Sequence, residues 1–395
     1  MTKNNEHKKL NVPNLRFPKF QGEWKKTKFG DIATGFDYGM NAAAKNYDGV
    51  NKYIRITDID EASSTYTDKD IVSPDGILTD NYLVNNRDIL LARTGASTGK
   101  SYLYKQSDGK LYYAGFLIRA NVTTHDPYFV FSQLHTHRYW RWVSIMSARS
   151  GQPGINSQEY SSFPIYITSI EEENKIAKLL SLLDKRIATQ NKIIEDLKKL
   201  KCAIIETEYN SKGHEYRIGD IIEQKSLRNK SNLVKTVLSV NNKLGFINQD
   251  EQFEDRIVAS EDTSNYKVVT KDDFAYNPAR INVGSIARLK SYDKGIVSPM
   301  YICFKVTDSI VPEYLESYFA TNQFFKEMQK RLEGSVRLCL SFEGLCNIPV
   351  VIPNMDEQAE IGKRIHLLEN KIETECNILS QYEKQKQYLL RQMFI

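Results

Sequence analysis

The chain contains an internal repeat, and this feature constrains its fold more than any other. The segment "FPIYITSIEEENKIAKLLSLLDKRI", which begins at Phe163, aligns with "IPVVIPNMDEQAEIGKRIHLLENKI", which begins at Ile348. Pro164 then matches Pro349, and the offset between the two copies is 185 residues. A repeat of this length predicts two similar structural units within one chain.

The same offset relates two earlier stretches of the chain. Asp88 of "RDILLARTGASTGKS" falls on Asp273 of "KDDFAYNPARINVGS". Near the start of each copy, "GDI" at 30–32 corresponds to "GDI" at 219–221, here with an offset of 189. Each copy therefore consists of a strand-rich part followed by a segment rich in Leu, Ile, Glu and Lys.

These Leu-rich segments, 171–208 and 356–393, contain no Pro and only one Gly, which predicts two long helices. Apolar residues recur every 3.5 positions on average, as in a coiled coil. The seam breaks at the same two places in both copies, Gln190/Glu375 and Lys201/Lys386. Each helix could pack on its own strand-rich part, but two matching seams favour pairing of the helices with each other. The predicted seam residues are Ile176, Leu180, Leu183, Ile187, Ile194, Leu197 and Ile204, then Ile361, Ile365, Leu368, Ile372, Leu379, Tyr382 and Leu389.

Two equal units in one chain favour a pseudo-twofold arrangement with antiparallel helices. We therefore predict an α+β fold, in which two similar strand-rich domains are joined by two long antiparallel coiled-coil helices. A helix of about 35 residues spans about 50 Å, so we expect the helix pair to hold the two domains apart. The predicted boundaries are an N-terminal arm at 1–20, domains at 21–168 and 211–353, and helices at 169–210 and 354–395.

The distribution of charge indicates which parts of the chain face a polyanion. The net charge is +5. Residues 171–208 hold eight basic and eight acidic residues, and 356–393 hold six and seven, so the helices carry −1 and the remainder carries +6. The strand-rich domains and the N-terminal arm are therefore the basic part of the chain, as expected if they face a polyanion such as nucleic acid.

The loop "RTGASTGKS" at 93–101 is similar to a phosphate-binding loop but lacks its spacing. Such a loop needs four residues between its glycines and a helix after it, whereas Gly95 and Gly99 are separated by three. The following "SYLYKQSDGKLYYAGFLIR" predicts a β-hairpin. "YNPAR" at 276–280 lacks the second Pro and the aromatic residue of an adenine methyltransferase motif. No other catalytic pattern is present, so we predict a protein that recognises a binding partner and has no catalytic activity of its own.

We predict no metal site, no secretion and no membrane span. The five cysteines have no zinc-like spacing, and His135 and His137 lack a carboxylate or thiol partner at ligand spacing. The opening "MTKNNEHKKLNVPNLRF" has no apolar region typical of a signal peptide. A reduced, cytoplasmic protein is the expectation.

Taken in order, these segments are similar to the specificity subunit of Type I restriction-modification systems. The lead-in "PNLRFPKFQGEWKKTKFGDI", the two loops, the two strand-to-helix junctions and the terminal "YEKQKQYLLRQMF" carry the resemblance over roughly residues 13–395. The resemblance implies two target-recognition domains, each reading one half of a bipartite, asymmetric DNA sequence. It also implies that the helices set the spacer and dock the partner subunits.

The resemblance further implies that the chain itself is not catalytic and holds no cofactor. Its partners would be double-stranded DNA, two adenine-N6 methyltransferase subunits that use S-adenosylmethionine, and two restriction subunits, translocase-nucleases that use ATP and Mg²⁺. The main alternative is a stand-alone coiled-coil DNA-binding or scaffold protein without a methyltransferase partner.

Loops that leave a stiff sheet can contact phosphates for affinity and base edges for specificity. Because the two loops differ in sequence, we expect two different half-sites. Heads related by a pseudo-twofold axis should place these half-sites about one DNA turn, or about 34 Å, apart. In the first domain the predicted DNA contacts are Arg55, Arg93, Thr94, Ser97, Thr98, Lys100, Gln152 and Asn156. In the second they are Asn277, Arg280, Asn282, Ser285 and Arg337.

Overall fold

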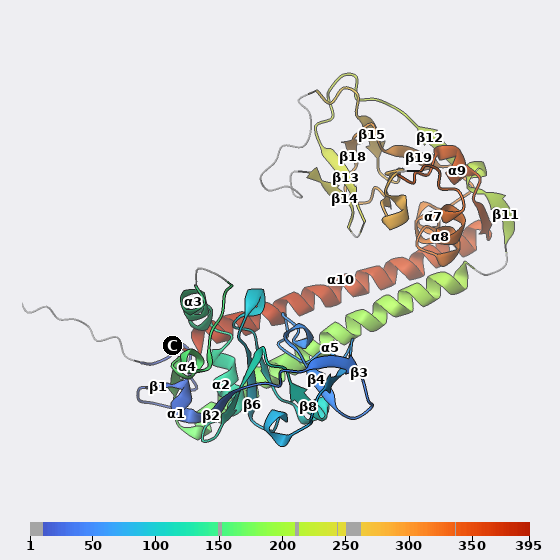
Figure 1. Ribbon diagram of the computed structural model, residues 1–395. Coiled ribbons are helices and arrows are strands. Elements are labelled where there is room, and N and C mark those ends of the chain that lie inside the picture. Colours follow the sequence, from blue (N-terminus) through green and yellow to red (C-terminus); the bar gives the residue numbers. More distant parts are fainter. Residues whose placement is uncertain (1–10, 149–151, 210–212, 243, 250–261, 336) are drawn as a thin grey trace, which may run out of the picture. The chain divides into compact units, whose positions relative to one another are not determined.

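The computed structural model of the chain describes residues 11–148, 152–209, 213–242, 244–249, 262–335 and 337–395. The chain forms two compact units, whose elements are labelled in Figure 1. Unit 1 consists of Met1–Asn191 and Asn377–Ile395, and unit 2 of Lys192–Cys376. Both divisions fall inside long helices, so each unit contains a sheet-bearing head together with parts of both helices.

The head of unit 1 is built on a four-stranded antiparallel sheet of order β2-β9-β6-β7. Its central strand, "DILLA" at 88–92, is buried on both faces, which explains why the sequence shows a continuous apolar run there and no alternation. The four strands are β2 (Ala33–Tyr38), β9 (Leu117–Val122), β6 (Asp88–Ala92) and β7 (Ser101–Leu103).

Smaller elements surround this sheet. Three two-stranded ladders are formed by β1 (Lys25–Lys28) with β10 (Pro164–Ile167), β3 (Ala43–Asn46) with β5 (Val72–Asp75), and β4 (Lys52–Ile54) with β8 (Leu111–Tyr113). The short helices are α1 (Phe29–Ile32), α2 (Pro127–Gln133), α3 (His137–Met146) and α4 (Ser157–Ser161). The 3-10 turns are η1 (Ile56–Asp58), η2 (Asp80–Tyr82), η3 (Gly95–Ser97) and η4 (Gln106–Asp108).

The predicted hairpin after the first loop is wrong, although both of its strands exist. β7 pairs with β6, whereas β8 pairs in parallel with β4. The "SDG" turn at 107–109 lies in the connection, but the chain then continues into a different sheet. Turn chemistry alone does not decide which neighbour a strand pairs with.

Unit 2 repeats the central sheet and adds a second one. The sheet of order β12-β19-β16-β17 is again antiparallel throughout. Its strands are β12 (Ile222–Lys225), β19 (Ile302–Val306), β16 (Phe274–Tyr276) and β17 (Ile286–Arg288). The second sheet has the order β14-β13-β18-β15 and consists of β14 (Gly245–Asn248), β13 (Val237–Asn241), β18 (Lys294–Val297) and β15 (Lys267–Thr270), with β13 and β18 parallel.

The rest of unit 2 follows the element order of unit 1. The ladder of β11 (His214–Arg217) with β20 (Pro349–Ile352) corresponds to β1 with β10. The short helices are α7 (Pro312–Tyr318), α8 (Asn322–Gln329) and α9 (Phe342–Cys346), and the 3-10 turns are η5 (Ile218–Asp220) and η6 (Ile281–Val283). The predicted duplication and the α+β class are therefore confirmed.

The two long helices, α5 (Ile170–Glu208) and α10 (Met355–Gln392), lie inside the predicted segments 169–210 and 354–395 and end within three residues of those bounds. At the start of α10, Asn354 Oδ1 accepts the Glu357 N–H (3.0 Å), and a Glu357 carboxylate oxygen accepts the Asn354 N–H (3.3 Å). This capping box satisfies backbone groups that the first helical turn leaves without partners. None of the helices in the described ranges combines the length and apolarity that a membrane crossing needs.

The helices pair in antiparallel fashion within each unit. In unit 1, Ile176 and Leu180 near the start of α5 share a core with Leu389 near the end of α10. In unit 2, Ile205 near the end of α5 shares a core with Ile361 near the start of α10. Both cores also contain residues of the sheets, so each helix end packs on its own head as well as on the other helix. The two alternatives considered for the helices therefore coexist.

Lys201 and Lys386, which interrupt the seam at equivalent positions of the repeat, make equivalent ion pairs in the two units. In unit 1, Lys386 Nζ lies 2.7 Å from a carboxylate oxygen of Asp184. In unit 2, Lys201 Nζ lies 2.5 Å from a carboxylate oxygen of Glu369. Both members of the pair are shifted by 185 residues. All of the predicted apolar seam residues are buried or half-buried.

Candidate nucleic-acid interface

The loop at 93–101 in unit 1 leaves the C-terminal end of β6 and is held by a second loop at 152–156. The N–H of Gly95 donates to the carbonyl of Pro153 (2.9 Å), and the N–H of Ile155 donates to the carbonyl of Arg93 (2.9 Å). A 3-10 turn and then β7 follow Gly95, and no α-helix does. The loop therefore lacks the helix N-terminus on which a P-loop binds phosphate.

Gly99 permits the close packing of this loop. Its φ is +95°, a conformation that residues with a Cβ rarely adopt. A Cβ at this position would lie 2.8 Å from Val143 and 3.0 Å from Trp140, both in α3. Glycine at 99 thus serves backbone geometry and contact with α3.

The two loops bring most of the predicted contacts of the first domain to one place. Gln152 is exposed and lies beside Gly95, while Thr94 and Ser97 are half-buried. Asn156 is half-buried and caps α4, since its side chain accepts the N–H of Glu159 (2.9 Å). Asn156 therefore has a structural role in addition to its predicted role.

Thr98 is buried, with 7% of its surface exposed. Its hydroxyl donates to the carbonyl of Gly95 (2.8 Å). A side chain so placed stabilises the loop and presents no group to DNA, so we leave Thr98 out of the set of residues proposed to contact DNA.

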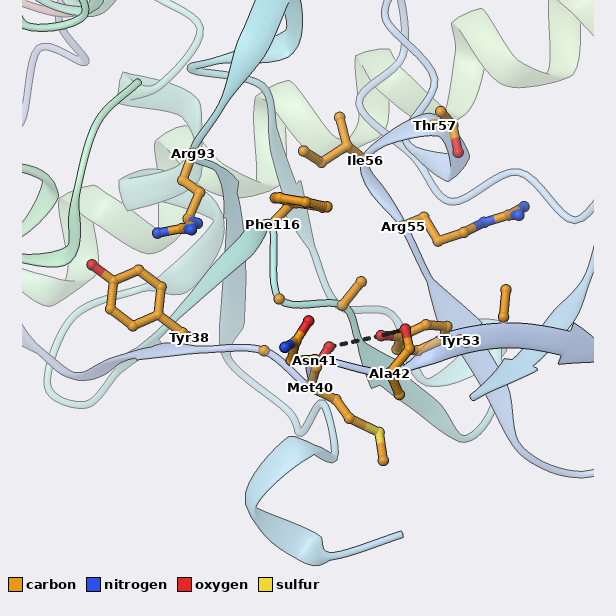
Figure 2. Close-up of a pocket in the computed structure, with 14 residues that line it drawn as sticks. Tyr38, Met40, Asn41, Ala42, Tyr53, Arg55, Ile56, Thr57, Arg93 and Phe116 are labelled. Atoms are coloured by element: carbon orange, nitrogen blue, oxygen red, sulfur yellow. Dashed lines mark hydrogen bonds between the residues drawn. The ribbon is translucent and has the colours of Figure 1, made fainter. Parts of the chain in front are cut away.

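A cavity of about 620 Å³ opens beside the first loop. Figure 2 shows Arg93 directed toward the ring of Tyr38, with Phe116 between Arg93 and Ile56. Two other lining residues are joined by a hydrogen bond, since the Tyr53 hydroxyl donates to the carbonyl of Met40 (2.7 Å). Tyr38 and Phe116 were not predicted from the sequence.

Three cations of unit 1 were predicted to bind DNA, and the structure distinguishes them by their partners. Arg55 hydrogen-bonds to Asp58 (2.8 Å) and to Asp70 (3.1 Å), and the bond to Asp58 raises the pKa of Arg55 above its usual value. Lys100 lies 3.1 Å from a carboxylate oxygen of Glu61. Among the described residues Arg93 has no carboxylate partner; its guanidinium lies over the ring of Tyr38, 4.7 Å from the centroid. Arg93 is thus the cation of this group whose charge is not neutralised.

The corresponding loop of unit 2 leaves β16 and is held in the same way. The N–H of Leu340 donates to the carbonyl of Pro278 (3.1 Å). Leu340 and Pro278 follow Ile155 and Arg93 by 185 residues, so the hydrogen bond that joins the two loops of unit 1 is repeated in unit 2. The pair of hydrogen-bonded loops is therefore present in both heads.

The predicted contacts of unit 2 divide by exposure. Arg280 and Arg337 are exposed, and Asn282 is half-buried. Asn277 and Ser285 are buried: Asn277 Oδ1 accepts the N–H of Ala279 (3.1 Å), and the Ser285 hydroxyl donates to the carbonyl of Val240 (3.4 Å). These two residues stabilise the loop, so we also leave them out of the DNA-contacting set.

His135 uses both ring nitrogens inside unit 1. Nδ1 lies 2.9 Å from the carbonyl oxygen of Phe131, and Nε2 lies 3.0 Å from the hydroxyl of Ser64. Burial, assisted by the positive charge of Lys386, lowers the pKa of His135 to about 4. A histidine in this setting is neutral at pH 7 and is a structural residue.

We expect unit 1 to lose stability as the pH falls from about 6.5 toward 4. Over this range the unfolded chain protonates the histidine, whose unfolded pKa is about 6.5, while the folded chain does not. The loss attributable to His135 should reach about 2 kcal/mol at pH 5. In His135→Asn the amide can still donate to Phe131 but cannot titrate, so denaturant unfolding of this variant should depend less steeply on pH. Equal pH slopes for the two proteins would contradict this role.

The comparisons with known proteins agree on one family. The model described as "Type I restriction modification DNA specificity domain" matches residues 21–199 and again 210–384. The chain is 24% identical over 341 residues to the Type I restriction enzyme MjaVIII specificity subunit of Methanocaldococcus jannaschii, covering 78% of each. It is 22% identical over 303 residues to the putative Type I restriction enzyme MjaX specificity subunit of the same organism, covering 69% of this chain and 68% of the relative.

Two solved structures share the fold. The S subunit of a Type I restriction-modification system from M. genitalium matches with a TM-score of 0.61 at 16% identity, covering 97% of this chain and 99% of the other. A second structure, from work on complex assembly and conformational transition of the Type I system, matches with a TM-score of 0.54 at 13% identity, covering 94% and 97%.

Proposed function

The chain belongs to the family of Type I restriction-modification DNA specificity subunits, and on this basis we propose that each head reads one half of a bipartite, asymmetric DNA site. Recognition of a DNA sequence within a restriction-modification complex follows from that membership. Within such a complex, the specificity subunit is the non-catalytic member. The observation that carries the proposal is the repeated loop pair, joined by Ile155 to Arg93 in unit 1 and by Leu340 to Pro278 in unit 2. The same scaffold presents different side chains, as two different half-sites require.

The test is to sequence N6-methyladenine in the DNA of a methylation-free host that expresses the chain with its methyltransferase partner. We expect one bipartite motif, two short defined blocks separated by unspecified base pairs. Replacing residues 211–350 with those of a related subunit of different specificity should change one block and leave the other intact. A continuous motif, or a replacement that changes both blocks, would contradict the proposal.

We further propose that α5 docks a methyltransferase subunit through an apolar stripe beside the seam. Leu179, Ile193 and Leu200 recur at multiples of seven residues, and Leu182 lies one turn from Leu179. All four are exposed although each is a large apolar residue on a long helix. Exposed apolar rows of this kind mark protein interfaces, and a partner helix is the occupant that matches their helical spacing.

The complex that we propose contains two methyltransferase subunits, which would bind S-adenosylmethionine, and two restriction subunits, which would use ATP and Mg²⁺. The specificity subunit would supply no cofactor site. Because the proposed complex acts on the chromosome and on incoming DNA, we propose that the specificity subunit acts in the cytoplasm.

A further inference from the structure

Three side chains gather at one edge of the central sheet of unit 1. Tyr38 ends β2, Arg93 follows the last residue of β6, and Phe116 precedes the first residue of β9. The strand register places these positions side by side, since Tyr38 pairs with Ile118 and Ala92 pairs with Leu117. The N–H of Arg93 also donates to the carbonyl of Phe116 (3.1 Å). The sheet therefore holds the three residues in a defined arrangement, and all three line the cavity (Figure 2).

The guanidinium of Arg93 is oriented so that it can bind a planar hydrogen-bond acceptor. Its contact with Tyr38 restricts the guanidinium plane, and no carboxylate among the described residues competes for its N–H groups. A pre-oriented guanidinium presents two parallel donors, which match the O6 and N7 acceptors of guanine in the major groove. Arg55, which lines the same cavity, is hydrogen-bonded to two aspartates and is not available in this way.

Phe116 offers an apolar surface next to this donor pair. It is 60% exposed, although a phenyl ring is normally buried in the core of a domain. In the major groove, an apolar side chain beside a base-reading residue contacts the C5-methyl group of thymine. A ring at this position therefore discriminates for an A·T pair beside the guanine.

The second head supports the assignment by its differences. Arg119 lies opposite Leu90 in unit 1, and Cys303 lies opposite Ala275 in unit 2, so β9 and β19 differ by 184 residues. Met300 then occupies the place of Phe116 and is likewise exposed, at 57%. Pro278, however, replaces Arg93 and has no cationic group. An exposed apolar residue thus stands at this place in both heads, whereas an arginine at the position of Arg93 is found in the first head and is replaced by Pro278 in the second.

We propose that Tyr38, Arg93 and Phe116 form a base-reading site in unit 1 for a G·C pair adjacent to an A·T pair. Arg93 binds O6 and N7 of the guanine, Tyr38 holds the guanidinium in position, and Phe116 contacts the thymine methyl group. This inference rests on the proposed function, because it assigns bases to one of the two half-sites.

The experiment uses the full chain with its methyltransferase partner, both in the methylation-sequencing host and as the purified complex on duplex oligonucleotides. The half-site of unit 1 is the block that stays unchanged when residues 211–350 are replaced. In that block we expect a G·C pair whose preference falls roughly 5- to 150-fold in both Arg93→Ala and Arg93→Lys. Deoxyuridine in place of the adjacent thymine should weaken methylation by the wild-type complex and have no further effect in Phe116→Ala.

The matched control is Arg141→Ala, which removes an exposed arginine of unit 1 that lies in α3, outside the two loops, and should leave the first block unchanged. The proposal is overturned if the first block contains no G·C pair next to an A·T pair. It is also overturned if Arg93→Ala keeps full guanine preference, because the guanine would then be read by another residue. If the wild-type complex produces no bipartite motif at all, the proposed function fails instead.

Discussion

Removing one heptad from each long helix, residues 189–195 and 374–380, is expected to shorten the unspecified spacer of the DNA site by about three base pairs or to abolish methylation. The two heptads correspond through the 185-residue repeat. Deleting seven residues preserves the 3.5-residue seam and shortens each helix by about 10 Å. Three base pairs also rotate one half-site by about 100° around the DNA axis, which is why loss of methylation is the alternative form of the same effect.

The measurement is methylation sequencing of the doubly deleted subunit in complex with its methyltransferase. The matched control replaces both heptads with designed heptads of equal length that keep the apolar seam positions, and this variant should retain the native spacer. An unchanged spacer in the deleted protein would show that the helices do not determine the distance between the half-sites.

Placing charges in the apolar stripe of α5 is expected to separate the chain from its methyltransferase partner. The double variant Leu182→Glu and Ile193→Glu would remove two apolar side chains from the proposed interface, each worth about 1.5–3 kcal/mol on full burial. The affinity should fall by roughly 100-fold or more. Both residues are exposed in the chain, so its own stability should change little.

Co-purification from cells that express both proteins measures this effect, and thermal unfolding checks the fold. The control variant Ala188→Glu with Cys202→Glu adds the same charge on another face of α5, where both residues are also exposed, and should bind normally. If the double variant co-purifies like the wild type, the stripe is not the docking surface. If the wild-type chain elutes alone, the stand-alone DNA-binding alternative gains instead.

The two long helices are a part of the fold that can be predicted well from the sequence. Their apolar residues recur over ten turns in two copies, and the observed ends differ from the predicted ends by one to three residues. A signal repeated this often averages out local exceptions such as Gln190 and Lys201. Lys201 is tolerated because the opposite helix supplies Glu369, a pairing that requires the antiparallel register.

The interface illustrates the opposite case. Of the residues chosen by type, Arg93, Thr94 and Gln152 lie close together, because the loop at 152–156 is hydrogen-bonded to the loop at 93–101. Choice by residue type could not separate the exposed Arg280 from the buried Ser285, which lies five residues away in the same loop. It also missed Tyr38 and Phe116, since an aromatic residue beside a strand usually belongs to the core.

The sequence by itself determined that the chain is duplicated, that each copy ends in a long helix and that the excess of basic residues lies outside the helices, because each of these properties is periodic or additive along the chain. The tertiary structure alone decided that Arg93 contacts no carboxylate of the described residues while Arg55 and Lys100 do, and that Tyr38 and Phe116 lie beside Arg93. These facts depend on contacts between residues up to about eighty positions apart. Such contacts arise only when the strands take their register in the sheet.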